Sequence, residues 1–309
     1  MSESLEQCPL CDGTDWKKLP IPGHWIGQQI FDGLAGHLGL VRCRQCTLVF
    51  INPRPSPSQL NLFYSSDIYS CHETEGSASA GAKARYILQK IERYVPSNLE
   101  RTLLDYGAGG GGFIAFANSA GWKTEGFEPG LRGLETCDRL GLNVSADPNQ
   151  LQTNWAGIVT MHHVFEHLSN PIEVLASLRR YLTTQGRLYV EVPNERSLRS
   201  RLSLPILSRN GSVDERYRAF PIHLMYYNRS TLTGMLEKAG WRVEATFTLG
   251  LGFDEYFVQS SKANASNKSM QNASNSMRDK TVDRKRLRHR VRDAYLALGI
   301  GENLAVIAS

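Results

Sequence analysis

The sequence predicts an α/β fold in which helices cover both faces of a mostly parallel sheet, preceded by a small cysteine-rich module. From residue 101 onward, short apolar runs typical of strands alternate with segments of helical periodicity. A glycine-rich loop directly follows the first of these strands, and two C-x-x-C pairs stand near the N-terminus. These three observations set the fold class and the order of its parts.

The composition is that of an ordinary water-soluble globular protein, with 41% hydrophobic and 21% charged residues and a net charge of +5. A membrane-spanning helix needs about 20 consecutive apolar residues, and no such run occurs. The first residues, MSESLEQCPLC, lack the basic and apolar segments of a secretory signal. We therefore expect a cytoplasmic protein without a membrane partner.

The cysteines near the N-terminus predict a metal site. In a reducing compartment, two C-x-x-C pairs indicate metal binding more than disulfides, although unrelated free thiols remain the alternative. Four thiolates complete a tetrahedral structural Zn²⁺ site and leave no open coordination position. We expect residues 1–52 to form a zinc-binding module whose ligands are Cys8, Cys11, Cys43 and Cys46. The two remaining cysteines, Cys71 and Cys137, are expected to be small buried side chains.

The rest of the chain divides into two parts. Residues 53–98 are expected to hold a linker at NPRPSPSQ (52–59), a loop or lid, and a helix over 82–94. Residues 99–309 form the α/β domain. Strands are predicted over 101–106, 123–128, 142–146, 156–164, 186–193, 241–249 and 303–308, with helices over 111–120, 131–140, 171–182 and 228–240.

The domain is interrupted by a segment rich in serine and asparagine over about 259–281, which we expect to be a disordered insertion. A basic helix follows, with six Lys or Arg among the nine residues from Arg284 to Arg292. We interpret it as a solvated helix face, with a contact to an anion or RNA as the alternative.

The glycine loop, LLDYGAGGGGF (103–113), contains the dinucleotide pattern G-x-G-x-x-G and also an acid two residues before the first glycine. That acid, Asp105, would repel a diphosphate, whereas it suits a ligand that carries a cation. Glu128 ends the second strand, where an acid accepts hydrogen bonds from a ribose diol. A diol and a cation without a phosphate describe S-adenosylmethionine (SAM). An NAD-dependent dehydrogenase is the weaker alternative.

At these residues the sequence resembles the class I SAM-dependent methyltransferases. The matching segments are LLDYGAGGGGF, GFEP and VFEHLSNPIEVLASLRRYLTTQGRLYVEVPN, and the resemblance covers about 100–309. It implies a Rossmann-like, seven-stranded sheet whose last strand, 303–308, runs antiparallel. The order of CPLC, CRQC, NPRP and FY before this fold resembles the subset with an N-terminal zinc module, which includes sugar methyltransferases. The cofactor-binding residues are expected to be Asp105, Gly107, Ala108, Gly109, Gly111, Glu128 and His163.

Two histidines are the catalytic candidates. The resemblance implies that His167 lines the substrate pocket and that His223 acts near the reacting atom. Histidine is the side chain suited to taking a proton from a hydroxyl or amine near neutral pH. In the zinc-module family an acid usually precedes the second histidine, whereas this chain has Ile222. This departure favours an oxygen or nitrogen acceptor over carbon.

The predicted function is methyl transfer from SAM to a small polar acceptor: a sugar, nucleotide-sugar or related biosynthetic intermediate. An RNA methyltransferase is the second interpretation, although residues 1–52 are not strongly basic, which disfavours nucleic acid as a partner. A protein that binds SAM without turnover is the third, because a fold alone never establishes catalysis. The sequence names neither the acceptor atom nor the oligomeric state.

Overall fold

The computed structural model describes residues 2–21, 25–34, 36–66, 78–198, 200, 219–250, 296 and 298–309. The predicted insertion at 259–281, the basic run Arg284–Arg292 and Cys71 lie outside these residues. Within the described part of the chain, every helix is too short or too polar to cross a lipid bilayer.

The main sheet has seven strands in the order β12-β13-β10-β9-β6-β7-β8. The five strands from β10 to β8 pair in parallel, while β13 runs antiparallel to both of its neighbours. The predicted class I sheet and its antiparallel last strand are confirmed. The strands are β6 (Thr102–Tyr106), β7 (Lys123–Phe127), β8 (Val144–Ser145), β9 (Ala156–His162), β10 (Leu182–Pro193), β12 (Val243–Leu249) and β13 (Asn303–Ala308).

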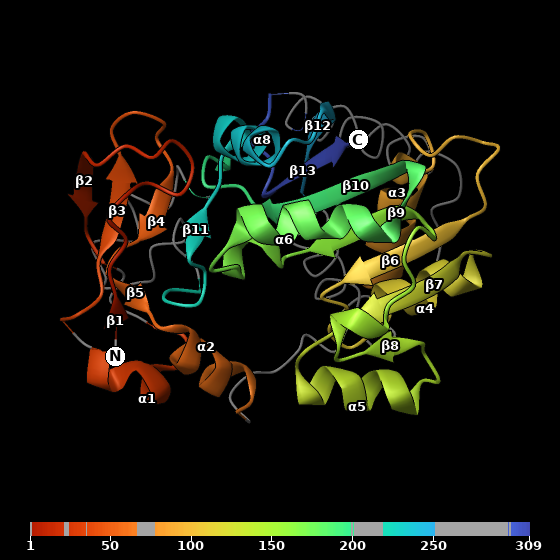
Figure 1. The fold of residues 1–309 in the computed structure, drawn as a ribbon, viewed down its shortest axis with the longest axis horizontal. Coiled ribbons are helices and arrows are strands. Elements are labelled where there is room, and N and C mark those ends of the chain that lie inside the picture. The colour runs from red at the N-terminus through yellow and green to blue at the C-terminus, as the bar shows by residue number, and fades with distance from the viewer. Residues whose placement is uncertain are drawn as a thin grey trace, which may run out of the picture.

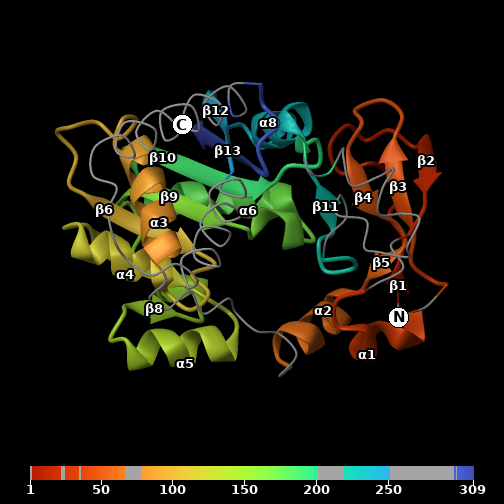
Figure 2. The same cartoon turned by 180° about the vertical axis from the view of Figure 1, so that it is seen from behind.

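Helices cover both faces of this sheet (Figures 1 and 2). Helices α6 and α8 lie on one face and α3 on the other, where it contacts α4. Neighbouring strand residues alternate between the two cores: Leu104 and Val159 face α6 and α8, and Leu103 and Ile158 face α3 and α4. The helices are α3 (Ala78–Ile91), α4 (Gly112–Ser119), α5 (Leu131–Arg139), α6 (Pro171–Leu178) and α8 (Arg229–Lys238), with short 3-10 turns η2 (Pro148–Gln150), η3 (Phe165–His167) and η4 (Arg179–Tyr181).

The N-terminal residues build a second, antiparallel sheet in the order β11-β4-β3-β2. Its edge strand β11 (Met225–Tyr226) comes from the far end of the chain, beside α8 in sequence (Figure 1). Phe220 and Ile222 also belong to the core beneath this sheet. The remaining elements are β1 (Ser2–Glu3), β2 (Trp16–Leu19), α1 (Gln28–Phe31), η1 (Asp32–Leu34), β3 (Leu40–Cys43), β4 (Val49–Ile51), β5 (Arg54–Pro55) and α2 (Pro57–Tyr64).

The segment 52–59, predicted as a linker, contains β5 and the start of α2. Ser56 and Gln59 form a capping box, and Pro57 stands in the first helical turn, where its missing N–H costs nothing. The three prolines therefore mark a strand end and a helix start. The helix predicted over 82–94 is present as α3, displaced toward the N-terminus.

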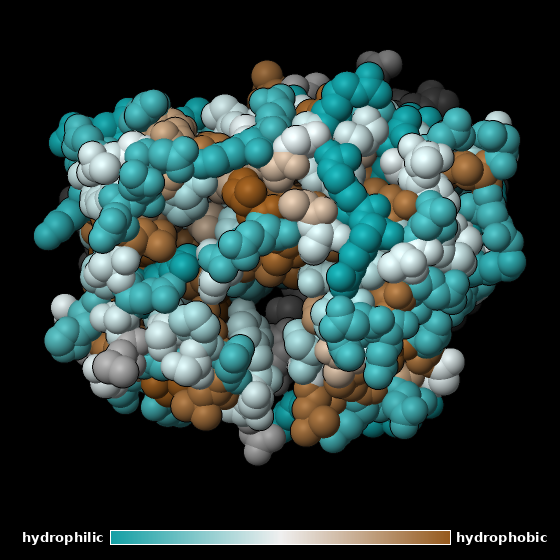
Figure 3. Space-filling view, in the orientation of Figure 1, coloured by the Kyte–Doolittle hydropathy of each residue, from teal (hydrophilic) through white to brown (hydrophobic). Residues whose placement is uncertain are grey.

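Polar contacts tie the N-terminal sheet to the main domain. Arg42 on β3 pairs with buried Glu195 at 2.6 Å. The backbone of Leu224 bridges the two parts, because its N–H donates to Glu166 O and its carbonyl accepts from Ile51 N. Figure 3 shows a hollow on the surface between the N-terminal part and the main α/β part. The segment around residue 224 therefore belongs to both parts at once.

Candidate active site

The glycine loop between β6 and α4 has a backbone conformation that residues other than glycine would adopt only with strain. Gly107, Gly109 and Gly111 have φ of 92°, 55° and 77°, the left-handed region that glycine enters without steric cost. A Cβ on Gly107 would collide with Val164 Cγ2, and one on Gly111 would collide with Leu142 Cδ1. Ala108, whose N–H donates to Phe127 O at 2.9 Å, holds the loop against β7. The loop therefore lies close to the segment that follows β9.

Asp105 is buried at the carboxyl end of β6, with 2% of its surface exposed. Its Oδ1 accepts a hydrogen bond from Thr160 Oγ1 on β9 at 2.7 Å. Burial raises the pKa of Asp105, and the neighbouring His162 imidazole and the Thr160 hydroxyl oppose that rise. The carboxylate is thus held in a fixed orientation at the start of the loop.

Glu128 follows the end of β7 and closes the other side of the loop. Its two carboxylate oxygens each accept one backbone N–H at 2.7 Å, from Gly109 and Gly130. A carboxylate has about four lone-pair positions, so acceptor capacity remains for a further donor. Burial raises the pKa of Glu128, the two amide hydrogen bonds lower it, and the charge of Asp105 adds to the rise. The two acids therefore share one negative region.

Glu191, on β10, is the centre of a buried polar network that the sequence analysis missed. Its Oε1 lies 2.9 Å from Lys83 Nζ and 2.6 Å from Asn303 Nδ2, and its Oε2 lies 3.0 Å from the Tyr189 hydroxyl. Burial raises the pKa of this carboxyl, but Lys83 and the imidazoles of His162 and His163 outweigh burial and hold it well below its usual range. An acid inside the apolar run LYVEVP was the available sequence signal.

His163 lies between two buried acids. Its Nδ1 is 3.5 Å from Glu166 Oε1, and its Nε2 is 3.4 Å from Glu191 Oε1. Burial lowers the pKa of His163, but the two carboxylates outweigh burial and raise it to about 9. His163 also has a left-handed φ of 55°, a strained conformation that is found at functional sites. The two carboxylates therefore favour the charged imidazole and hold its ring between them.

His167 and His223, from distant parts of the sequence, meet beside Glu166. Their rings pack edge to face with centroids 4.6 Å apart, and His223 Nε2 is 3.9 Å from Glu166 Oε1. Burial lowers the pKa of His167. Burial raises the pKa of Glu166, but the imidazoles of His163, His167 and His223 outweigh burial and lower it to about 2. Tyr64 of α2 also reaches this group, with its hydroxyl 2.9 Å from His167 Nδ1.

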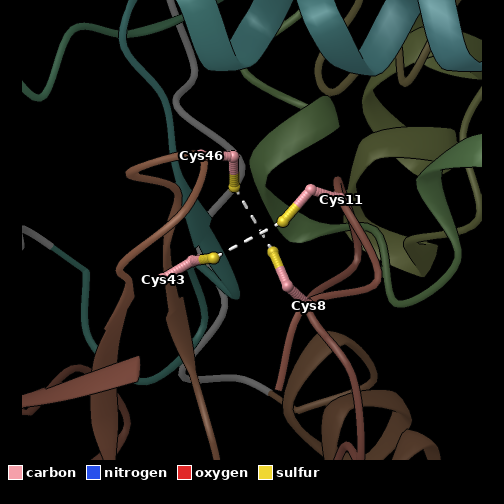
Figure 4. A group of neighbouring side chains, drawn as sticks. All are labelled: Cys8, Cys11, Cys43 and Cys46. Atoms are coloured by element: carbon pink, nitrogen blue, oxygen red, sulfur yellow. Dashed lines mark hydrogen bonds between the residues drawn. The ribbon is translucent and has the colours of Figure 1, made fainter. Parts of the chain in front are cut away.

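The four N-terminal cysteines form a separate cluster, with their sulfur atoms pointing toward a common centre (Figure 4). The Sγ atoms of Cys8 and Cys46, and those of Cys11 and Cys43, are 3.5 Å apart. Four thiolates around Zn²⁺ at about 2.3 Å would have sulfur atoms about 3.8 Å apart. The donor set and its spacing therefore fit a tetrahedral ion with little adjustment. Cys137 is buried beneath the glycine loop, away from this cluster.

The sheet and the site together define the class of the protein. A parallel sheet with an antiparallel last strand, a glycine loop after β6 and acids at the ends of two strands are the features of class I methyltransferases. Residues 80–246 match the family model of a methyltransferase domain, and this match spans more than half of the chain. The chain therefore belongs to this methyltransferase family, and it is a SAM-dependent enzyme.

Three solved structures that match this chain share at most 19% of its sequence. A SAM-dependent methyltransferase from Archaeoglobus fulgidus is 19% identical, with a TM-score of 0.47 over 74% of this chain and 93% of that one. One from Mesorhizobium loti is 12% identical, with a TM-score of 0.46 over 73% and 97%. A possible histamine N-methyltransferase from Thermotoga maritima is 16% identical, with a TM-score of 0.44 over 75% and 91%. No curated protein matches the sequence, so the family assignment rests on the family model.

We expect Gly107→Ala to destabilise the loop by about 1–3 kcal/mol, because the new methyl group meets both a left-handed φ and the side chain of Val164. SAM affinity should fall with it. The matched control is Gly110→Ala, whose Cβ would make only an ordinary contact with Thr136 at 3.6 Å. Thermal unfolding and SAM calorimetry on both variants check this. Equal thermal midpoints and equal SAM affinities in the two variants would contradict this prediction.

Proposed function

We propose that the enzyme transfers a methyl group from SAM to an oxygen or nitrogen of a small polar acceptor, such as a sugar, nucleotide-sugar or related biosynthetic intermediate. The observation that carries this proposal is the grouping of two chemically different clusters at the carboxyl ends of β6, β7 and β9. One cluster is the acidic glycine loop, and the other is the group of histidines around Glu166. Ligands of open α/β sheets bind at this edge.

In this proposal SAM occupies the glycine loop. Asp105 lies near the positively charged methionine end, Glu128 accepts hydrogen bonds from the ribose hydroxyls, and Gly107, Ala108, Gly109 and Gly111 let the backbone approach. The acidic pair supports a cationic ligand, since two buried carboxylates side by side would disfavour a diphosphate. His163 forms the wall toward the acceptor. When bound, SAM supplies an activated methyl group on a sulfonium, so the protein mainly has to place the acceptor in line with it.

The acceptor is placed beside His167 and His223. The residue before His223 is Ile222, whose side chain belongs to the apolar core of the N-terminal part. No second acid therefore stands next to His223 in the chain, which favours an oxygen or nitrogen acceptor over carbon. The backbone after residue 223 joins the N-terminal sheet, and the carbonyl of Phe220 accepts a hydrogen bond from Ile26 N. We therefore propose that residues 1–52, with α2 and β11, form one wall of the acceptor pocket.

Cys8, Cys11, Cys43 and Cys46 are proposed to hold a structural Zn²⁺. Four thiolates fill the tetrahedral coordination, so this ion takes no part in chemistry. The ion would join the β3–β4 turn to the turn before β2 and so brace the part of the chain that supports His223.

Asp105→Asn is expected to weaken SAM binding by roughly 10–100-fold, since a hydrogen bond to a charged group contributes about 1.5–3 kcal/mol. Asparagine keeps the size of the side chain and an oxygen for the Thr160 hydroxyl. Isothermal calorimetry with SAM measures the change, and Asp138→Asn, on the exposed side of α5, serves as the control. Unchanged affinity in the Asp105 variant would remove the basis for placing the cofactor here.

His223→Ala is expected to keep SAM affinity and to lose turnover, because the residue lies in the acceptor cluster and not in the glycine loop. Transfer of radiolabel from SAM to fractionated small polar molecules, with an RNA fraction alongside, measures the activity. His37→Ala, an exposed histidine of the N-terminal part, is the matched control. Full activity in the His223 variant would show that this residue is not needed for methyl transfer.

Cys46→Ser is expected to release zinc and to lower the thermal midpoint, because a structural zinc site contributes folding free energy. Metal analysis should find about one more zinc per chain in the native protein than in the variant. Cys137→Ala should retain the metal, since its thiol is remote from the cluster. Equal zinc content in both variants would refute the assignment of these ligands.

A further inference from the structure

Three side chains with metal-binding atoms converge where the N-terminal sheet meets the main domain. A carboxylate oxygen of Glu166 and one ring nitrogen each of His167 and His223 all lie within 4.8 Å of one another. Glu166 and His167 stand on η3, and His223 stands just before β11. We propose that this trio binds a divalent transition-metal ion that holds a hydroxyl oxygen of the acceptor. The proposal rests on the proposed methyl transfer and describes how its acceptor is bound.

The first support is the carboxylate of Glu166. It is 1% exposed, and within the described part of the chain neither of its oxygens has a hydrogen-bond partner. Its Oε1 forms ion pairs with His163 Nδ1 at 3.5 Å and with His223 Nε2 at 3.9 Å. The surrounding imidazoles favour the charged carboxylate, but both of these contacts are longer than a good hydrogen bond, so a closer partner would compensate the burial of the charge better. A metal ion, which approaches a carboxylate oxygen to about 2.0–2.2 Å, provides such a contact.

The second support is the orientation of His167. Its Nδ1 lies 3.0 Å from the carbonyl oxygen of Ile222, and a carbonyl can only accept a hydrogen bond. Nδ1 therefore carries the proton and donates it, and the Tyr64 hydroxyl beside the same nitrogen acts as an acceptor. This leaves the lone pair on Nε2. Metal-binding histidines show the same arrangement, with the second ring N–H donated to a backbone carbonyl, carboxylate or water.

The donor set indicates the kind of ion. Imidazole nitrogens suit Zn²⁺, Co²⁺, Ni²⁺ or Fe²⁺, whereas Mg²⁺ and Ca²⁺ prefer oxygen ligands. Three protein ligands leave coordination positions open for a substrate, unlike the four thiolates of the cysteine cluster. The trio is therefore suited to a substrate-binding ion and the cysteines to a structural one.

The consequence for the reaction is a hydroxyl acceptor. An oxygen bound to a divalent ion loses its proton at a lower pH than in water, and here the proton passes to solvent. The oxygen lone pair then forms the O–CH₃ bond as the CH₃–S bond of SAM breaks. The electron pair of the broken bond stays on sulfur, which gives S-adenosylhomocysteine. No oxidant or reductant is needed.

The test uses the full chain with zinc in its cysteine cluster and Co²⁺ as the probe. Titration should give one further equivalent of bound Co²⁺, with ligand-field absorption but without the charge-transfer band that thiolate ligands would produce. Glu166→Gln, which keeps the shape of the side chain, should weaken Co²⁺ binding more than about tenfold, since even outer partners of metal ligands account for 10–100-fold. Glu173→Gln, an exposed acid on α6, is the matched control.

The proposal is overturned if the native protein shows no saturable Co²⁺ site beyond the cysteines, or if Glu166→Gln binds Co²⁺ as the native protein does. Circular dichroism checks folding, and His223→Gln serves as the second variant should the first fail to fold. SAM calorimetry on the same samples separates the two proposals. If the native protein binds SAM but has no Co²⁺ site, only the metal inference is overturned. If the native protein does not bind SAM, the proposed function is overturned, together with the metal inference that rests on it.

Discussion

The buried carboxylate of Glu191 is the contact on which the arrangement of the site most depends. It joins α3 through Lys83, the end of β9 through His162 and the following His163, and β13 through Asn303. A buried charge is tolerated only when its partners stay in place, and removing one partner of such a group is costly. Helix α3 and three neighbouring strands are therefore held in one register at the edge of the sheet where ligands bind.

Charge separates the two halves of that edge. Around the glycine loop the buried groups are acids, Asp105 and Glu128, and their ligand is expected to bring the positive charge. Glu166 is surrounded by histidines from the residue after β9, from η3 and from the segment before β11. Val164, packed against the glycine loop, is the short link between the halves. The two sites that we propose for the cationic methyl donor and for the acceptor thus have different surroundings a few residues apart.

Much of the main domain can be predicted from the sequence, because buried parallel strands are continuous apolar runs and the helices between them carry clear periodicity. Each C-x-x-C pair is equally local, since its two cysteines lie in one turn, although the cluster joins two pairs that are far apart in the chain. What the sequence does not indicate is non-local. Strand β11 has two residues and no pattern of its own, and nothing near His223 shows that it meets Glu166. The acid of Glu191 is visible within an apolar strand, but its partner Lys83 lies on a helix far away in the chain.

The position of β11 has a consequence for how the chain is made. All four cysteines leave the ribosome before the edge strand that completes their sheet, Met225–Tyr226, and five strands of the main sheet also precede that edge strand. Until then β4 keeps an unpaired edge, which is a template for pairing with other chains. Prematurely ended translation products would expose this edge permanently, so a truncated polypeptide should be far more prone to aggregate than the finished one.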